Sequence, residues 1–143
     1  RLLKHTAADY LVYGLTDEFL YTHPEILTTG FAIFSQRVRA AGMFVVQAHP
    51  FRKHMIVTNP KLLDAIEVYN GNKRHCSRND IADIWADRFQ MRKTSGSDTH
   101  RPDDDACAGI RTETPITNNE ELLAVLRSGN YTLIKEAVDL KED

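Results

Sequence analysis

The sequence predicts an α/β fold, with a mostly parallel sheet and peripheral helices, because two kinds of segment alternate along it. Short apolar runs rich in Val, Ile, Phe and Tyr are bounded by Gly, Pro or Asn, which is typical of buried strands. Amphipathic helical segments separate several of these runs. The chain has 143 residues, of which 42% are hydrophobic, and a single domain of about 100–150 residues is common. We therefore expect residues 1–143 to form a single domain.

The apolar runs define the strands that we expect in this fold. The expected strands are Tyr10–Leu15, Met43–Ala48, Ala65–Tyr69, Lys93–Ser95, Ala108–Arg111 and Tyr131–Lys135. We expect them to form the sheet around which the helices pack.

Three helical segments are expected between the strands. The first follows Pro24 and ends at Gly42, the second begins near Ser77 or Asn79, and the third runs from the N-cap Asn118 to a stop at Gly129. Their apolar spacing predicts the faces that pack on the core. These faces are Phe31, Phe34, Val38 and Ala41 in the first helix, Ile81, Ile84, Trp85 and Phe89 in the second, and Leu122, Leu123 and Leu126 in the third.

Charge and hydropathy disfavour two classes of protein. The 18 Lys and Arg residues against 20 Asp and Glu give a net charge of −2, whereas a dedicated nucleic-acid binder usually has a strong basic excess. No apolar run approaches the roughly 20 residues that cross a bilayer, and no signal peptide opens the chain. The expectation is a cytoplasmic protein without a membrane partner or a strong nucleic-acid signal.

Polar side chains follow three of the expected strands. His49 comes after the second strand, Asn70 after the third, and Asp98 and His100 after the fourth. Functional sites of α/β folds lie at the carboxyl ends of parallel strands. These positions are therefore the first candidates for a functional site.

Asp98 and His100 form the most informative of these groups. In an extended backbone, residues i and i+2 project to the same side, so the carboxylate and the imidazole would converge on one ion. Ligation by oxygen and nitrogen suits Zn²⁺, Mn²⁺ or Fe²⁺ better than Ca²⁺. Gly96 allows the backbone to pass close to such a site.

Three motifs in this order resemble the C-terminal part of a PHP (polymerase and histidinol phosphatase) domain. They are Ala48-His49-Pro50-Phe51-Arg52, Ile66-Glu67-Val68-Tyr69-Asn70-Gly71 and Gly96-Ser97-Asp98-Thr99-His100. The resemblance extends from about Asp9 to Tyr131 and is strongest to small bacterial proteins described as predicted metal-dependent phosphoesterases. It implies a distorted seven-stranded βα barrel that holds up to three divalent metal ions, usually Zn, Mn or Fe.

The same resemblance implies roles for individual residues. His49, Asp98 and His100 would be metal ligands, and Asp9 stands where many relatives place a ligand His. The alternative for Asp9 is a solvated loop carboxylate. His75 is a candidate catalytic residue, because relatives resemble this chain around Arg74-His75-Cys76-Ser77-Arg78-Asn79.

The remaining candidates are interpreted from the residues themselves. Arg52 is a candidate catalytic residue, and both Arg52 and Arg74 are candidates for phosphate contact, because a guanidinium binds phosphate oxygens by paired hydrogen bonds; the alternative is a solvated basic loop. Glu67 is interpreted as a paired strand residue rather than a ligand. Asn70 would bind a ligand or orient His49. Asp103-Asp104-Asp105 is interpreted as a solvated acidic turn.

The sequence departs from the PHP pattern in its first part. PHP proteins begin with a His-x-His strand followed by further ligands, and no such motif precedes Asp9. His5 and His23 are interpreted as loop histidines. We expect the chain to be the C-terminal portion of a PHP-like domain, with fewer metal ions than the intact family site and little activity by itself.

The expected function is metal-dependent hydrolysis of phosphate esters, in which a metal-activated water attacks phosphorus. The substrate would be a small phosphorylated molecule or a nucleotide. The alternative is a PHP-like binding or structural module that lacks the chemistry. An incomplete barrel would also expose an apolar sheet edge, through which copies of the chain could associate.

Overall fold

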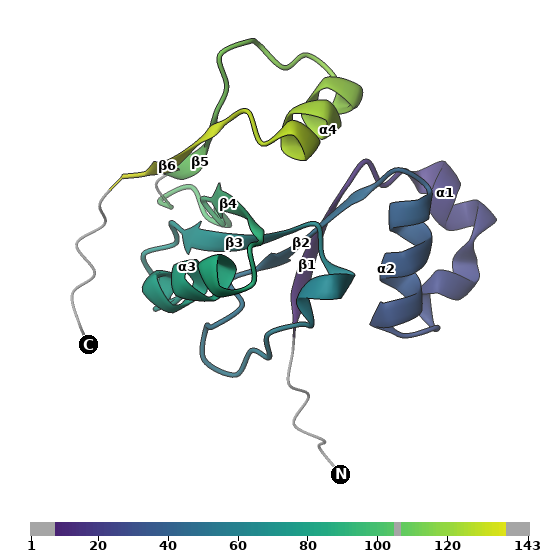
Figure 1. Cartoon of the computed structure of the whole chain (residues 1–143), viewed down its shortest axis with the longest axis horizontal. Helices are drawn as coiled ribbons and strands as arrows, with labels where there is room; N and C mark the ends of the chain where they lie inside the picture. The colour runs from purple at the N-terminus through teal and green to yellow at the C-terminus, as the bar shows by residue number, and fades with distance from the viewer. Residues whose placement is uncertain (1–7, 105–106, 137–143) are drawn as a thin grey trace.

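The computed structural model describes residues 8–104 and 107–136, which form a four-stranded sheet, a separate two-stranded ribbon and surrounding helices (Figure 1). The sheet has the order β1-β2-β3-β4 and the ribbon pairs β5 with β6. Strands β2, β3 and β4 are parallel, whereas β1 runs antiparallel to β2 and β5 antiparallel to β6. The strands are β1 (Asp9–Tyr13), β2 (Phe44–Ala48), β3 (Ala65–Asn70), β4 (Arg92–Gly96), β5 (Ala108–Arg111) and β6 (Thr132–Lys135).

All six expected strands are present, and the four-stranded sheet is mixed: two of its three strand pairings are parallel and one, between β1 and β2, is antiparallel. The helical segment after β1 returns the chain to the end at which β1 finishes, so Tyr13 pairs with Phe44 and Asp9 with Ala48. The strands of the described residues do not close into a barrel. The α/β class is therefore confirmed, and the PHP-type barrel is not observed in this part of the chain.

The first expected helix is divided into the 3₁₀ helix η1 (Pro24–Leu27) and α2 (Phe31–Ala40). A further helix, α1 (Asp17–Thr22), precedes Pro24 and was not predicted. Gly30, with a φ of 81°, is the N-cap of α2, and this left-handed geometry interrupts the helix that begins after Pro24. Val38 is buried and Phe31 and Phe34 pack beside it, as expected, whereas Ala41, the fourth residue of the expected face, is the exposed C-cap of α2.

Helix α3 (Asn79–Arg88) buries a different face from the expected one. Ala82 and Ala86 pack against β3, while Ile81, Ile84 and Phe89 are 42%, 69% and 45% exposed. Because Ala82 and Ala86 have small side chains, α3 lies close to β3, and the larger residues of the helix are on the side away from the strand. Trp85 is partly buried against the same cluster and lies edge-on to Phe51.

Helix α4 (Asn119–Ser128) has the expected ends and the expected buried face. The Asn118 side chain accepts a hydrogen bond of 2.9 Å from the Glu121 N–H, and Gly129 ends the helix with a φ of 73°. Leu126 is buried, and Leu122 and Leu123 pack beside it.

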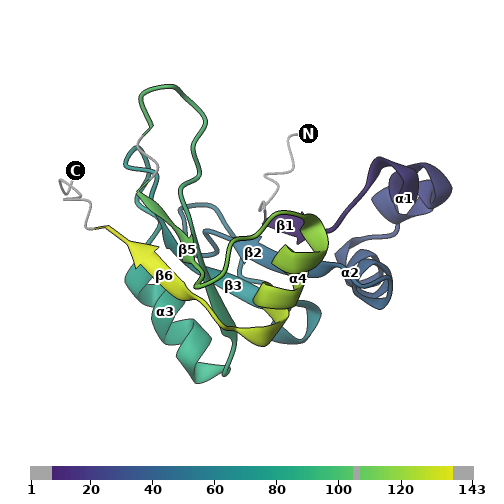
Figure 2. The same ribbon diagram turned by 90° about the horizontal axis from the view of Figure 1, so that it is seen from above.

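The two faces of the sheet are covered by different elements, as Figure 2 shows from above. On one face, Val45 packs with α2, and Ile66 and Val68 pack with α3. On the other face, Phe44 and Val46 pack against α4 and β5. The carboxyl ends of β2, β3 and β4 meet at one edge, where the polar residues that follow them are placed together. No helix of the described residues is long and apolar enough to cross a membrane.

Candidate functional site

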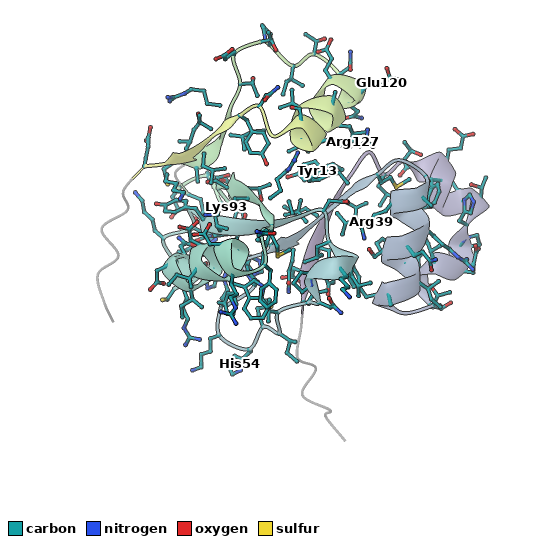
Figure 3. All side chains as sticks on the ribbon, viewed as in Figure 1. Tyr13, Arg39, His54, Lys93, Glu120 and Arg127 are labelled. Carbon is teal, nitrogen blue, oxygen red and sulfur yellow. The ribbon has the colours of Figure 1, made fainter. Side chains whose placement is uncertain are left out.

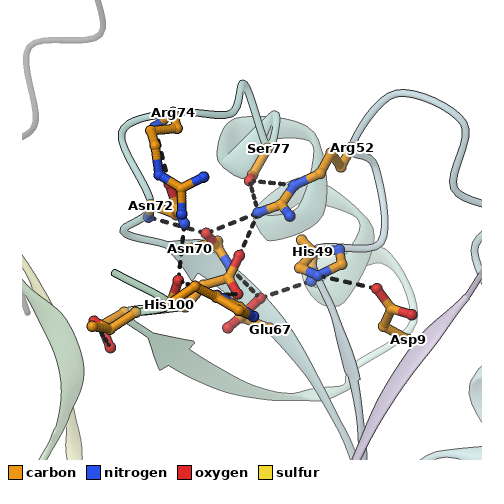
Figure 4. A network of polar contacts seen from close by, with 12 residues as sticks. Asp9, His49, Arg52, Glu67, Asn70, Asn72, Arg74, Ser77 and His100 are labelled. Carbon is orange, nitrogen blue, oxygen red and sulfur yellow. Dashed lines mark hydrogen bonds and ion pairs between the residues drawn. The ribbon is translucent and has the colours of Figure 1, made fainter. Parts of the chain in front are cut away.

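A cavity of about 540 Å³ lies at the carboxyl ends of β2, β3 and β4. The six candidate residues Asp9, His49, Arg52, His75, Asp98 and His100 all line it. The other lining residues are Leu11, Ala48, Asn72, Arg74 and Arg101. Residues that are far apart in the sequence therefore meet at the edge that the strand-end rule predicts. A network of polar contacts connects most of them (Figure 4).

His49 is the first residue after β2 and has a buried side chain. Its backbone has a φ of 29°, and its N–H donates a hydrogen bond of 2.7 Å to Glu67 Oε2. Its Nε2 lies 3.5 Å from Asp9 Oδ2 on the antiparallel neighbour β1, whereas the buried Nδ1 has no hydrogen-bond partner among the described residues. Burial, together with the charge of Arg52, lowers the pKa of His49, which favours the neutral imidazole that can bind a metal.

Glu67 is a buried carboxylate below the cavity. Besides the His49 N–H, it accepts a hydrogen bond of 3.0 Å from Asn70 Nδ2. Burial raises its pKa to about 7. A Cβ atom on Gly96 would lie 2.5 Å from Glu67 Oε1, so the glycine makes room for the carboxylate. Glu67 is thus paired inside the sheet and holds the backbone of His49.

Arg52 connects the three strand ends through its guanidinium. It forms an ion pair of 2.8 Å with Asp98 Oδ2, and both side chains are largely buried. It also donates to Asn70 Oδ1 at 3.1 Å and to Ser77 Oγ at 3.0 Å. Burial alone would raise the pKa of Asp98, but the hydrogen bond and the charge of Arg52 outweigh it and lower that pKa.

Asp98 and His100 lie together, although not through an extended backbone. Asp98 has a φ of 52°, in the left-handed region, so the expected alternation of side chains does not apply. His100 Nδ1 lies 2.9 Å from the Asp98 carbonyl oxygen and 3.2 Å from its Oδ1. The pair is therefore produced by a tight turn, and its imidazole is largely exposed.

Asp104 corrects the expectation of a solvated acidic turn. Its carboxylate forms two hydrogen bonds with Arg74, at 2.9 and 2.8 Å, and accepts another of 2.8 Å from the His100 N–H. The hydrogen bond from Arg74 holds the pKa of Asp104 well below its usual range. Asp103 is exposed as expected, and Asp105 lies outside the described residues. Asp104 thus fixes the loop that carries His100.

The mouth of the cavity contains residues with weaker or missing sequence signals. His75 lines the mouth, and its side chain is exposed. Its partial removal from water, together with the positive charges of Arg52 and Arg74, lowers its pKa. Asn72 donates to the Asp98 carbonyl oxygen at 2.9 Å, but it was not among the site residues predicted from the sequence. Its place two residues after a strand-end Asn was the available signal. Ser77 and Arg101 were also missed.

The described residues fit a metal ion only in part. His49 with Asp9, and Asp98 with His100, give two pairs of nitrogen and oxygen donors. A catalytic zinc site usually has three protein ligands, and the described residues contain no group of three or more His, Cys, Asp or Glu that could hold a metal. His23 contacts Phe19 within the α1 segment and does not line the cavity, and His5 lies outside the described residues.

The comparison with protein families agrees with the sequence motifs. A family model described as PHP-associated matches residues 77–131, the segment that runs from two residues before α3 to the residue before β6. Asp98 and His100 lie inside this match. The match supports a PHP-associated domain family for this segment and thereby the resemblance to PHP proteins. No curated protein and no solved structure matches the chain.

Proposed function

We propose that this protein hydrolyses phosphate esters in a metal-dependent reaction and that the cavity at the ends of β2, β3 and β4 is the reaction site. The observation that carries the proposal is the convergence of His49, Arg52, Asp98 and His100 in one cavity. Imidazole and carboxylate groups are the usual protein ligands of Zn²⁺ and Mn²⁺, and guanidinium groups bind phosphate. The PHP-associated match over residues 77–131 supports the same class of protein.

Three guanidinium groups, those of Arg52, Arg74 and Arg101, line the cavity and provide N–H donors for a phosphate group. Asp9 and Asp98 line it as well and Asp104 pairs with Arg74, so the cavity offers guanidinium donors and not a surplus of positive charge. Arg52 and Arg74 are held in place by Asp98 and Asp104, and each guanidinium has five N–H donors, of which these contacts use only some. They would bind the phosphate oxygens of a small phosphorylated substrate or a nucleotide.

The metal part of the proposal needs ligands beyond the two observed pairs. His49 and Asp9 would contribute to one ion and Asp98 and His100 to another, with further ligands from outside the described residues. In phosphoesterases of this kind, bound metal ions activate water and stabilise the charge on the phosphate oxygens. Glu67 and Asp104 would keep His49 and His100 in position, because each accepts a hydrogen bond from the backbone N–H of that histidine.

A binding module without catalysis is the second candidate. The ion pair between Arg52 and Asp98 favours it, because the guanidinium already occupies one oxygen of a proposed metal ligand. Such a module would bind a phosphorylated molecule through the arginines without cleaving it.

Hydrolysis by the full-length protein separates the two candidates. The protein would be loaded with Mn²⁺ or Zn²⁺ and assayed with a phosphomonoester, a phosphodiester and a nucleotide. The proposal predicts release of phosphate or alcohol that stops when a chelator removes the metal. Binding of the same compounds without any cleavage would support the binding module instead.

A further inference from the structure

Three arginines meet at the opposite end of the sheet from the candidate functional site. A pocket of about 310 Å³ is lined by Arg39, Met43, Phe44, Asp64, Arg92 and Arg127. Arg39 comes from the last turn of α2 and Arg127 from the last turn of α4, while Arg92 begins β4. Figure 3 labels Arg39 and Arg127, which lie in the region between α2 and α4. The pocket therefore lies at the edge of the sheet where the parallel strands β2 and β4 begin.

The acidic residue of this pocket already has partners. Asp64 Oδ1 accepts a hydrogen bond of 3.1 Å from Arg39 Nε, and its Oδ2 accepts one of 2.8 Å from the Val45 N–H. The Arg39 guanidinium also donates to the Lys61 carbonyl oxygen at 2.9 Å. Asp64 thus compensates the charge of Arg39, and the other two arginines have no carboxylate partner in the part of the chain that the structure describes.

Among the described residues, the guanidinium groups of Arg92 and Arg127 donate hydrogen bonds to backbone carbonyl oxygens and to no side chain. Arg92 Nη1 donates to the Leu126 carbonyl oxygen at 2.6 Å and to that of Arg127, and Arg127 Nη2 donates to that of Gly42. Neither forms an ion pair within the described residues. Each guanidinium has five N–H donors in a fixed plane, so several remain for a ligand.

We propose that Arg39, Arg92 and Arg127 form a second anion site, which takes a phosphate group. Three guanidinium groups face one carboxylate, and a helix C-terminus carries only about half a negative charge. The positive charge that Asp64 leaves uncompensated is therefore larger than the partial negative charge at the C-terminal ends of α2 and α4. Met43 and Phe44 form a buried apolar floor, which weakens the screening of charge by water. The site does not depend on the proposed hydrolysis.

The bound phosphate would join three separate segments. Arg127 brings the end of α4, Arg92 the start of β4 and Arg39 the end of α2. The Gly42 carbonyl and the αL residue Gly129 lie against these side chains: a Cβ on Gly129 would be 3.4 Å from the Arg92 guanidinium carbon. The NMR signals of the Gly42 and Gly129 amides should therefore shift when phosphate binds to the three arginines.

A titration followed by ¹⁵N NMR tests this site without relying on a variant. Inorganic phosphate is added to the folded protein at constant ionic strength, and sodium chloride serves as the control anion. We expect saturable shifts of the Gly42 and Gly129 amides with a Kd of about 1 mM, and no such shifts with chloride. Adenosine 5′-monophosphate is titrated next: tighter binding than that of phosphate identifies a larger phosphate ester as the ligand, and equal binding identifies phosphate itself.

Variants then assign the binding to the three arginines. R92Q and R127Q should each weaken the phosphate-induced shifts by at least about tenfold, which corresponds to the loss of one charged contact. R88Q, which removes an exposed arginine from α3, should leave them unchanged. If Gly42 and Gly129 do not respond to phosphate in the unmodified protein, or respond equally to chloride, the arginines only neutralise helix ends and the proposal is wrong.

Discussion

Arg52 and Asp98 form an ion pair of 2.8 Å that joins the loop after β2 to the loop after β4. The side chains are only 14% and 13% exposed, so each charge depends on the other for compensation. Asn70 and Ser77 accept further hydrogen bonds from the same guanidinium. This pair therefore fixes the geometry of the cavity, and it occupies one carboxylate oxygen of Asp98 that a metal ion would otherwise bind.

Removal of Arg52 should destabilise the protein more than removal of an exposed arginine. R52Q leaves Asp98 without its partner in a largely buried position, so we expect the free energy of unfolding to fall by about 1–3 kcal/mol. The matched control is R37Q, because Arg37 pairs with Glu25 while both side chains are about half exposed; there the loss should be about 0–1 kcal/mol. Urea unfolding of both variants measures the difference, and equal losses would contradict the role given to Asp98.

The contact between Glu67 and Gly96 predicts a second effect on stability. In G96A the added methyl group would lie 2.5 Å from Glu67 Oε1, so the carboxylate or the β4 backbone must move. Such overpacking typically costs about 1–3 kcal/mol. G109A is the control, because nothing lies within 4 Å of a Cβ at that position. If G96A and G109A both unfold at the same temperature as the unmodified protein, Glu67 is not fixed against Gly96.

The ion pair between Lys93 and Asp83 predicts a pH dependence. The Lys93 ammonium, 2.8 Å from Asp83 Oδ1, lowers the pKa of Asp83. A carboxylate whose pKa is lower in the folded state stabilises the protein above its unfolded pKa of about 3.9. That stability is lost as the pH falls through the lower folded pKa. D83N should therefore be less stable than the unmodified protein at pH 7, by less than about 1 kcal/mol because the pair is partly exposed.

Urea unfolding at several pH values measures this difference. It should shrink as the pH falls from about 4 towards 2. E113Q, in which the replaced carboxylate has no ion pair among the described residues, should show no such trend. A D83N difference that stays constant with pH would contradict the assignment.

Helix α4 and the strand-end residues show what can be predicted from sequence. Asn118 and Gly129 determine their own local backbone, so the helix ends are correct. The placement of His49 and Asp98 in one cavity follows from the parallel arrangement of β2, β3 and β4. Local chemistry and the direction of neighbouring strands are thus sufficient for these features.

Features that depend on distant contacts were not predictable in the same way. The buried face of α3 follows from how closely Ala82 and Ala86 approach β3, and the apolar pattern alone favoured the larger residues. The pairing of Arg74 with Asp104 and the antiparallel direction of β1 depend on loop geometry that the sequence does not specify. The turn at Asp98, with its positive φ, is a further example.

The incomplete ligand set predicts weak metal binding by this chain alone. Two pairs of donors lack the third ligand of a typical catalytic site, so we expect fewer than three tightly bound metal ions after dialysis against Zn²⁺ or Mn²⁺. Elemental analysis of the purified chain measures the content. Three tightly held ions per chain would show that residues outside the described part complete the site within this chain.

The most direct test of the proposed function is the rate at which the full-length, Mn²⁺-loaded protein hydrolyses a phosphate ester, compared between two histidine variants. H49A removes the buried imidazole of the cavity, whereas H54N replaces an exposed histidine outside the cavity with a residue that tolerates its φ of 71°. Loss of a residue that orients a metal ligand costs about 10–100-fold, so loss of a ligand itself should lower kcat/KM by at least about 100-fold. The account predicts this loss in H49A and an unchanged rate in H54N. Equal rates for H49A and the unmodified protein, with both proteins folded, would contradict it.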